Sequence, residues 1–145
     1  MSAGAGYVVT SDTARVDVPL VHRWLSSESY WARGVPLEVV SKSVANSLCF
    51  SVHHETEGQV GFARVVTDRA TFAYLADVFV LAPHRGRGLS RHMMEAVLSH
   101  PELQGLRRWL LATRDAHELY ARFGFVPPTP GRLMERVVPD IYLKR

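Results

Sequence analysis

The stretch that decides the fold is FAYLADVFVLAPHRGRGLS, residues 72–90. Residues 72–81 are almost all apolar, and a strand with so few polar positions is usually buried on both faces, at the centre of a covered sheet. Residues 83–88 break this pattern with a proline and two glycines. Apolar residues then resume at helical spacing from Leu89, until Pro101 ends the segment. The stretch therefore predicts a central strand, a loop of glycine and arginine, and a helix.

The segments around this stretch predict a mixed α/β domain. Upstream we expect a strand, two helices and two strands joined by a hairpin turn, at residues 7–10, 16–27, 37–46, 48–54 and 59–66. Downstream we expect a strand, a short helix with Asp115 at its start and two closing strands, at residues 108–112, 115–123, 124–126 and 133–138. No repeat or linker divides the chain, so we interpret residues 1–145 as a single domain.

Composition excludes several classes of protein. With 47% hydrophobic and 10% aromatic residues, the chain is too apolar to be disordered. The only cysteine, Cys49, cannot form an internal disulfide or a thiolate zinc site, and it is expected to be a small buried side chain. The sequence lacks a secretory signal and any stretch of roughly 18 uncharged apolar residues. We therefore expect a soluble, cytoplasmic protein with no membrane partner.

The charge balance permits an anionic ligand without demanding one. Lysine and arginine number 17 against 14 acidic residues, a net charge of +3. Nearly all of the basic residues are arginines, which suits phosphate, although a compositional bias of the genome explains this equally well. The arginines are scattered and accompany no aromatic RNA-binding motif, so no nucleic-acid partner is expected. The histidines lack a supporting carboxylate cluster, so no metal is expected either.

The loop RGRGLS, residues 85–90, carries the strongest chemical signal. Its two glycines let the backbone approach a ligand closely. The helix that begins just after them presents unpaired N–H groups and the positive end of its dipole, and the two arginines add fork-shaped donors. The loop is thus predicted to bind phosphate. It is not a kinase-type loop, and the third glycine of the dinucleotide fingerprint is replaced by Arg91.

Two motifs together resemble the GNAT superfamily of acyl-CoA N-acyltransferases. Residues 85–90 resemble its coenzyme A pyrophosphate loop, with Ser90 where glycine or alanine is usual. DAHELYARFGF, residues 115–125, resembles its second signature, and Thr113 stands where asparagine is often found. The resemblance spans residues 59–126. It implies an α+β, three-layer fold with a central mixed, mostly antiparallel sheet, splayed central strands and helices on both faces.

The resemblance implies acetyl-CoA as co-substrate. Backbone groups of one strand are expected to pair with the pantetheine arm like an added strand, where a β-bulge near Val80 splays the sheet. Amides of the loop are expected to hold the pyrophosphate. The expected cofactor-binding residues are Val78, Phe79, Val80, Arg85, Gly86, Arg87, Gly88, Leu89, Ser90 and Thr113.

Two residues are candidates for catalysis. Tyr120 matches the family's tyrosine beside the thioester sulfur; with an ordinary pKa of about 10, it is protonated at neutral pH and can donate to the leaving thiolate. The alternative is a core tyrosine with a structural partner. Asp77 lies inside an apolar strand, where a carboxylate needs a partner or a wet cleft. It is predicted to be a general base, an anchor for the amine, or a structural carboxylate bonded to backbone amides.

The acceptor side is less defined. Glu28, Tyr30 and Trp31 follow the first predicted helix and could surround a cation, although Arg33 argues for an anionic group. The alternative is that these aromatic side chains only pack against the helix. Tyr74 is expected on the face of its strand opposite to Asp77, as a further polar contact to the substrate.

The leading hypothesis is an acetyl-CoA-dependent N-acetyltransferase acting on a small amine. Attack is expected to be direct, in a ternary complex, because no activated serine or cysteine nucleophile is visible. The alternative is a non-catalytic CoA-binding or sensing module of the same fold. The family often pairs through its sheets, so a homodimer is also considered.

Overall fold

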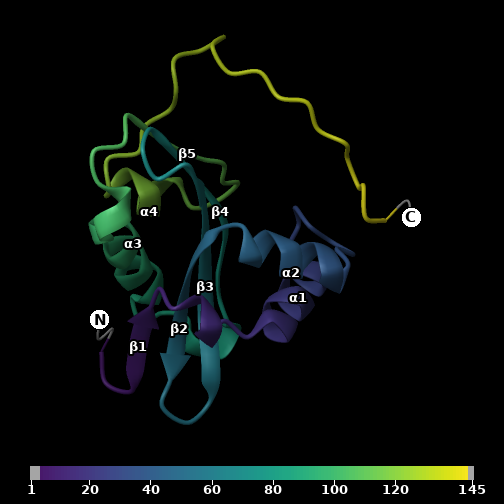
Figure 1. Cartoon of the computed structure of the whole chain (residues 1–145), viewed down its shortest axis with the longest axis vertical. Coiled ribbons are helices and arrows are strands. Elements are labelled where there is room, and N and C mark those ends of the chain that lie inside the picture. Colours follow the sequence, from purple (N-terminus) through teal and green to yellow (C-terminus); the bar gives the residue numbers. More distant parts are fainter. Residues whose placement is uncertain (1–3, 144–145) are drawn as a thin grey trace.

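The computed structural model describes residues 4–143 and contains one five-stranded sheet (Figure 1). Its strands follow in chain order: β1 (Tyr7–Thr10), β2 (Leu48–His54), β3 (Gly58–Thr67), β4 (Phe72–Val80) and β5 (Arg108–Leu111). The first four pair antiparallel, and β5 runs parallel to β4. The expectation of a mixed, mostly antiparallel sheet is confirmed.

Helices cover both faces of this sheet (Figure 1). One face carries α1 (Val18–Ser27) and α2 (Leu37–Ala45), and the other carries α3 (Leu89–Ser99) and the short α4 (His117–Ala121). Three 3-10 turns, Thr13–Arg15, Ala82–His84 and Pro101–Leu103, connect these elements. Within residues 4–143, no helix is both long and apolar enough to cross a bilayer.

Each helical layer buries an apolar stripe against the sheet. Met93, Met94 and Val97 of α3 pack on one face, while Val21 and Leu25 of α1 pack on the other. The sheet fills the space between them, with Phe50, Val65 and Leu75 facing α3 and with Phe62 and Phe79 facing α1 and α2. Apolar residues on both faces make the central strands rigid supports for a site at their ends.

The central strands carry a β-bulge. One residue of β3, Arg64, lies opposite two residues of β4, Ala76 and Asp77. The expected bulge is therefore present, but it lies a few residues before Val80 rather than beside it. An extra residue inverts the alternation of side chains along the strand. A given face of the sheet therefore carries odd-numbered residues of β4 before the bulge and even-numbered residues after it, or the reverse.

Beyond the bulge, β4 and β5 separate. Their pairing runs from Phe72 with Arg108 to Leu75 with Leu111 and ends there. Residues 76–80 of β4 therefore pair with β3 only, among the strands that the structure describes. This separation confirms the splayed central strands.

The two predicted closing strands, residues 124–126 and 133–138, are wrong: neither segment is a strand. Residues 127–143, here called the C-terminal arm, follow α4 as irregular chain with an exposed stretch from 127 to 141. Three prolines among residues 127–130 remove backbone donors and disfavour pairing at the start of the arm. In Figure 1 the arm arches away from the body and returns toward α1 and α2.

Candidate functional site

The backbone of Val78, Phe79 and Val80 forms an open edge next to the splay. Each pairs with β3 on one side, and no described strand occupies the other side. The Phe79 ring stacks on Trp24 with centroids 4.3 Å apart and the planes 7° from parallel, which fixes this part of β4. The stretch predicted to pair with a pantetheine arm thus presents backbone groups of alternate residues at a fixed open edge, where the Val80 carbonyl oxygen accepts from Arg85.

The loop after β4 has the conformation that an anion site requires. Gly86 and Gly88 have φ values of +80° and +75°, in the left-handed region that favours glycine. Helix α3 begins at Leu89 without a side-chain cap, so the amides of its first turn are available. Leu89 itself is buried and anchors the loop in the core, while Arg87 is exposed.

Arg85 joins this loop to the open edge of β4. Its Nε donates a hydrogen bond to the Val80 carbonyl oxygen at 2.9 Å. The guanidinium is therefore held at the point where the strand ends and the loop begins. A ligand that extends along β4 would reach this charge next.

A buried hydrogen bond that the sequence did not reveal fixes the residue directly before the loop. A hydrogen bond of 2.7 Å joins the Tyr7 hydroxyl and Nδ1 of the buried His84, which directly precedes the loop. On the other side of the ring, His84 Nε2 lies 3.4 Å from Glu57 Oε1. Because Tyr7 and His84 lie 77 positions apart, no local pattern could have indicated this pairing.

Tyr120 lies on α4 and lines an open groove of about 720 Å³ together with Thr113 and residues of β5. Its side chain is only 8% exposed. Burial raises the pKa of Tyr120 to about 12, with smaller contributions from Tyr30 and Asp115. Within the described chain, its hydroxyl makes no hydrogen bond to another protein group. The hydroxyl is therefore protonated at neutral pH and available as a donor.

Thr113 contacts the residue that precedes the helix carrying Tyr120. Its Oγ1 accepts a hydrogen bond of 3.0 Å from the Ala116 amide. The expectation that Asp115 caps this helix is wrong, because α4 begins later, at His117, with Ala116 in the capping position. The Thr113 oxygen is therefore engaged at the start of α4, and its predicted contact with the cofactor stays a prediction.

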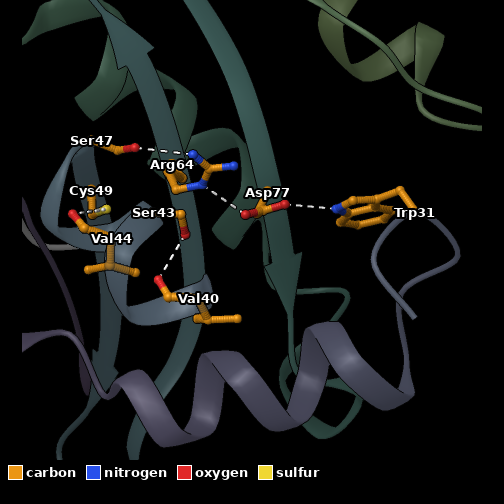
Figure 2. Close-up of polar contacts among 8 residues, drawn as sticks. All are labelled: Trp31, Val40, Ser43, Val44, Ser47, Cys49, Arg64 and Asp77. Carbon is orange, nitrogen blue, oxygen red and sulfur yellow. Dashed lines mark hydrogen bonds and ion pairs between the residues drawn. The ribbon is translucent and has the colours of Figure 1, made fainter. Parts of the chain in front are cut away.

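Asp77 has an arginine partner rather than backbone amides (Figure 2). Arg64 Nε donates to Asp77 Oδ2 at 2.8 Å, and Arg64 Nη1 donates to Ser47 Oγ at 3.1 Å. The indole Nε1 of Trp31 donates to the other carboxylate oxygen at 2.7 Å. The ion pair is largely buried, with side-chain exposures of 18% for Arg64 and 9% for Asp77. A lone arginine within the apolar run of β3 was the signal in the sequence that could have revealed this partner.

The loop after α1 is tied to both sides of the site. Trp31 reaches Asp77 on β4, and its ring lies 4.9 Å from that of Tyr30. The Arg114 guanidinium lies 3.9 Å from the centroid of the Tyr30 ring, and the Arg114 amide donates to the Tyr30 hydroxyl at 3.2 Å. Glu28 is exposed at the end of α1, and no ion pair joins it to another described residue.

Tyr74 lies on the same face as Asp77, which corrects the expectation of opposite faces. Tyr74 pairs with Val66, which is two residues from Arg64 on β3. Cross-strand partners share a face, as do residues two apart, so Tyr74 lies on the face where Arg64 meets Asp77. The bulge at Ala76 and Asp77 is the cause, because it inverts the alternation between the two positions. Tyr74, Asp77 and Trp31 therefore come together on the face that carries α1 and α2.

Cys49 is fully buried on β2, where it is the cross-strand partner of Arg64. Burial raises the pKa of its thiol to about 11, partly offset by Arg64. The thiol is therefore uncharged at neutral pH and a poor nucleophile. Across residues 4–143, no group of three or more histidine, cysteine, aspartate or glutamate side chains is arranged to hold a metal ion.

The chain is similar to known acetyltransferases in sequence and in fold. Residues 45–127 match the family model of the acetyltransferase (GNAT) domain. A protein of Gibberella zeae named as an acetyltransferase is 31% identical over 137 residues, covering 80% of this chain and 76% of its own. A crystal structure from Xanthomonas campestris pv. campestris, assigned to the GNAT family, is 54% identical with a TM-score of 0.91. That match covers 94% of this chain and 96% of the other.

A more distant structure shares the fold with a ligand present. It is a GNAT family acetyltransferase from Elizabethkingia anophelis with acetyl-CoA bound. It is 12% identical, with a TM-score of 0.64, over 87% of this chain and 80% of the other.

Proposed function

Because this chain belongs to the GNAT family of acetyltransferases, we propose that it transfers the acetyl group of acetyl-CoA to a primary amine by direct attack in a ternary complex. The observation that carries the proposal is the open edge of β4, which leads into the loop at residues 85–90 and lies beside the splay from β5. An open strand edge followed by an anion site suits an amide-containing arm that ends in a pyrophosphate.

In this proposal the chain binds the co-substrate mainly through its backbone. Val78, Phe79 and Val80 pair with the pantetheine amides. The amides of residues 86–90 hold the pyrophosphate, with Arg85 and Arg87 adding charge-assisted hydrogen bonds. Side chains contribute by fixing this backbone, as Leu89 does from the core and as Tyr7 does through His84.

Tyr120 acts as the general acid. The leaving sulfur must gain a proton as the amine attacks the thioester carbonyl, and a phenol that is protonated and free of protein partners can supply it. A pKa of about 12 keeps that proton in place over the whole working range of pH. Thr113 holds the helix that carries Tyr120, so its contribution is to position the acid.

The acceptor amine approaches from the face that carries Tyr74, Asp77 and Trp31. We assign Asp77 the role of holding Trp31 in place rather than that of the general base, because both of its oxygens already accept hydrogen bonds. The Trp31 ring offers a face to a cationic amine, whereas Arg114 already lies over the Tyr30 ring.

Two measurements test the proposal. In thermal melting, CoA should raise the midpoint of unfolding, since a ligand that binds only the native state stabilises it. A thiol-release screen of amines with acetyl-CoA should then identify an acceptor. No shift with CoA would refute the co-substrate, whereas a shift without turnover on any amine would favour the non-catalytic CoA-binding module.

The role of Tyr120 needs its own variant. Tyr120→Phe should lower kcat by about 10²- to 10⁴-fold, the usual contribution of a general acid, and should keep the shift with CoA. Tyr142→Phe, at the tip of the arm, serves as the matched control and should keep its turnover. Unchanged turnover in Tyr120→Phe would remove this residue from the mechanism.

A further inference from the structure

Building on the proposed function, we propose that the acceptor is a small amine that also carries a carboxylate, and that Arg114 binds this carboxylate. Arg114 follows β5 and contacts Tyr30, in the loop between α1 and α2. Its guanidinium is held in place without an anionic partner among the described residues. It also lies next to the groups that we assign to the amine and to the acid.

Tyr30 fixes Arg114 through two contacts. The guanidinium carbon lies 3.9 Å from the centroid of the Tyr30 ring, and the Arg114 amide donates to the Tyr30 hydroxyl at 3.2 Å. Cation–π attraction holds a guanidinium without supplying an acceptor for any of its five N–H donors. Because Arg114 is exposed, these donors stay open to a ligand. An arginine that is already held in place loses less conformational freedom when it binds.

The Arg114 guanidinium has no acidic partner within residues 4–143. Neither an ion pair nor a hydrogen bond from its N–H groups joins it to a side chain there, although Asp115 is the next residue of the chain. Arg64 is different, because Asp77 and Ser47 accept its hydrogen bonds. Arg114 therefore carries a charge that the described chain leaves unpaired. The two parallel N–H groups of a guanidinium match the two oxygens of a carboxylate.

Tyr30 also brings this charge close to the reacting groups. Its ring lies 4.9 Å from that of Trp31, whose face we assign to the amine. Tyr30 contributes to the raised pKa of Tyr120, so it lies near the proposed acid as well. These contacts are short enough for one small molecule to place its amine at Trp31 and its carboxylate at Arg114.

A chain of contacts sets the spacing between these two positions. Arg64 binds Asp77, and Asp77 accepts a hydrogen bond from the indole of Trp31 (Figure 2). The Trp31 ring meets the Tyr30 ring edge to face, with the planes 82° apart, and Tyr30 holds Arg114. The chain thus runs from the bulge to the segment after β5. Because each member is fixed by the next, an acceptor is recognised at its amine and at its carboxylate together.

The fold assigns Arg114 to the acceptor rather than to the phosphates of CoA. Tyr30 belongs to the loop after α1, and α1 packs on the same face of the sheet as α2. The loop at residues 85–90 leads instead into α3, which packs on the opposite face. Arg85 and Arg87 lie in that loop and suit the pyrophosphate. A cation held from the side of α1 and α2 is therefore available for a different anion.

The experiment measures thiol release from acetyl-CoA with pairs of amines, each an amino acid and the amine formed by its decarboxylation. The wild type should show a kcat/KM about 10- to 100-fold higher for the amino acid of an accepted pair, the usual value of charge-assisted hydrogen bonds. Arg114→Gln should lower kcat/KM for the amino acid by the same factor and leave that for the plain amine unchanged. The two amines differ in basicity, so the change in their ratio on substitution is the readout.

Matched variants and a matched acceptor accompany Arg114→Gln. Arg122→Gln changes another exposed arginine, at the end of α4, and should keep the preference for the amino acid. Tyr30→Phe keeps the ring beside the guanidinium and should keep the preference too, whereas Tyr30→Leu should lose most of it. O-phosphoethanolamine, tested beside β-alanine, distinguishes a phosphate from a carboxylate.

Turnover of amines with no preference for a carboxylate would overturn this assignment and leave the proposed function standing. A preference that survives Arg114→Gln, or that Arg33→Gln removes instead, would overturn the role of Arg114. A higher kcat/KM for O-phosphoethanolamine than for β-alanine would overturn the carboxylate, and weaker CoA binding by Arg114→Gln in calorimetry would place the guanidinium at the co-substrate. No shift of the melting midpoint with CoA, or no turnover of any pair, would refute the proposed function and this acceptor together.

Discussion

Replacing Asp77 by asparagine leaves the Arg64 guanidinium without its carboxylate inside the sheet. The side chain keeps its shape, but an amide cannot accept from both Arg64 Nε and Trp31 Nε1 as the two carboxylate oxygens do. One of the two N–H donors therefore loses its acceptor, because it faces the NH2 group of the asparagine, which is itself a donor. The substitution should destabilise the fold and loosen the loop that carries Trp31.

The size of the effect follows from how far the pair is buried. Breaking a fully buried ion pair by removing one partner costs about 3–5 kcal/mol. Arg64 keeps 18% of its side chain exposed and retains its hydrogen bond to Ser47, so water can compensate in part. We expect a loss of about 2–3 kcal/mol for Asp77→Asn, since a charge-assisted hydrogen bond and part of the desolvation of Arg64 are involved.

Urea denaturation measures this loss, and the midpoint should fall by about 1 M or more. The matched control is Glu95→Gln, because Arg91 and Glu95 form a pair of the same 2.8 Å length on the surface of α3. With side chains 52% and 40% exposed, that pair should contribute no more than about 0.5 kcal/mol. The double variant Arg64→Met with Asp77→Asn should lose about 2 kcal/mol less than the sum of the single variants.

The same variants decide what Asp77 does in catalysis. If Asp77 anchors Trp31, then Asp77→Asn and Trp31→Phe should lower kcat/KM by similar factors and leave the pH profile in place. Additive losses of stability in the double variant Arg64→Met with Asp77→Asn would refute the reasoning about the ion pair. A urea midpoint that Asp77→Asn leaves unchanged would refute it as well. Loss of the alkaline plateau in Asp77→Asn alone would restore the general base.

Three further outcomes follow from the loop and the core. Tyr7→Phe should raise the KM for acetyl-CoA several-fold with kcat nearly unchanged, because His84 loses its buried partner beneath the loop; an unchanged KM in steady-state kinetics would contradict this. Gly88→Ala should cost about 1–2 kcal/mol for its positive φ and weaken CoA binding in calorimetry, whereas Gly105→Ala, with a φ of +73°, should cost the same and bind CoA normally. Cys49, with a pKa raised from 9.0 to about 11, should resist thiol reagents at pH 8 until the protein unfolds. The stability that this raised pKa provides is fully present below pH 9 and is lost as the pH rises toward 11, which denaturation of wild type and Cys49→Ala at both values would measure.

The sequence contained the parts of the site that depend on neighbouring residues. Helical spacing located α3, and the two glycines located the loop at its start, because the left-handed backbone there is a local requirement. The second signature located Tyr120 on its short helix. Contacts between distant segments stayed hidden, since the bond from Tyr7 to His84 and the pair of Arg64 with Asp77 depend on which strands meet and in what register.

Register also explains the misplaced Tyr74. Counting residues puts positions 74 and 77 on opposite faces of a regular strand. The bulge inserts one residue between them, so that both face α1 and α2. No residue type in the segment indicates the bulge, because neither alanine nor aspartate at positions 76 and 77 is typical of one. The bulge is defined by the pairing of the two strands, in which Arg64 lies opposite both residues.

The closing strands fail for a different physical reason. A strand is a property of a pair, since its backbone groups need a second strand to bond with. The composition of residues 133–138 predicts their tendency to pair, and it says nothing of which chain supplies the partner. In a single copy the arm is held at Gly34, away from β5, and the tendency goes unmet.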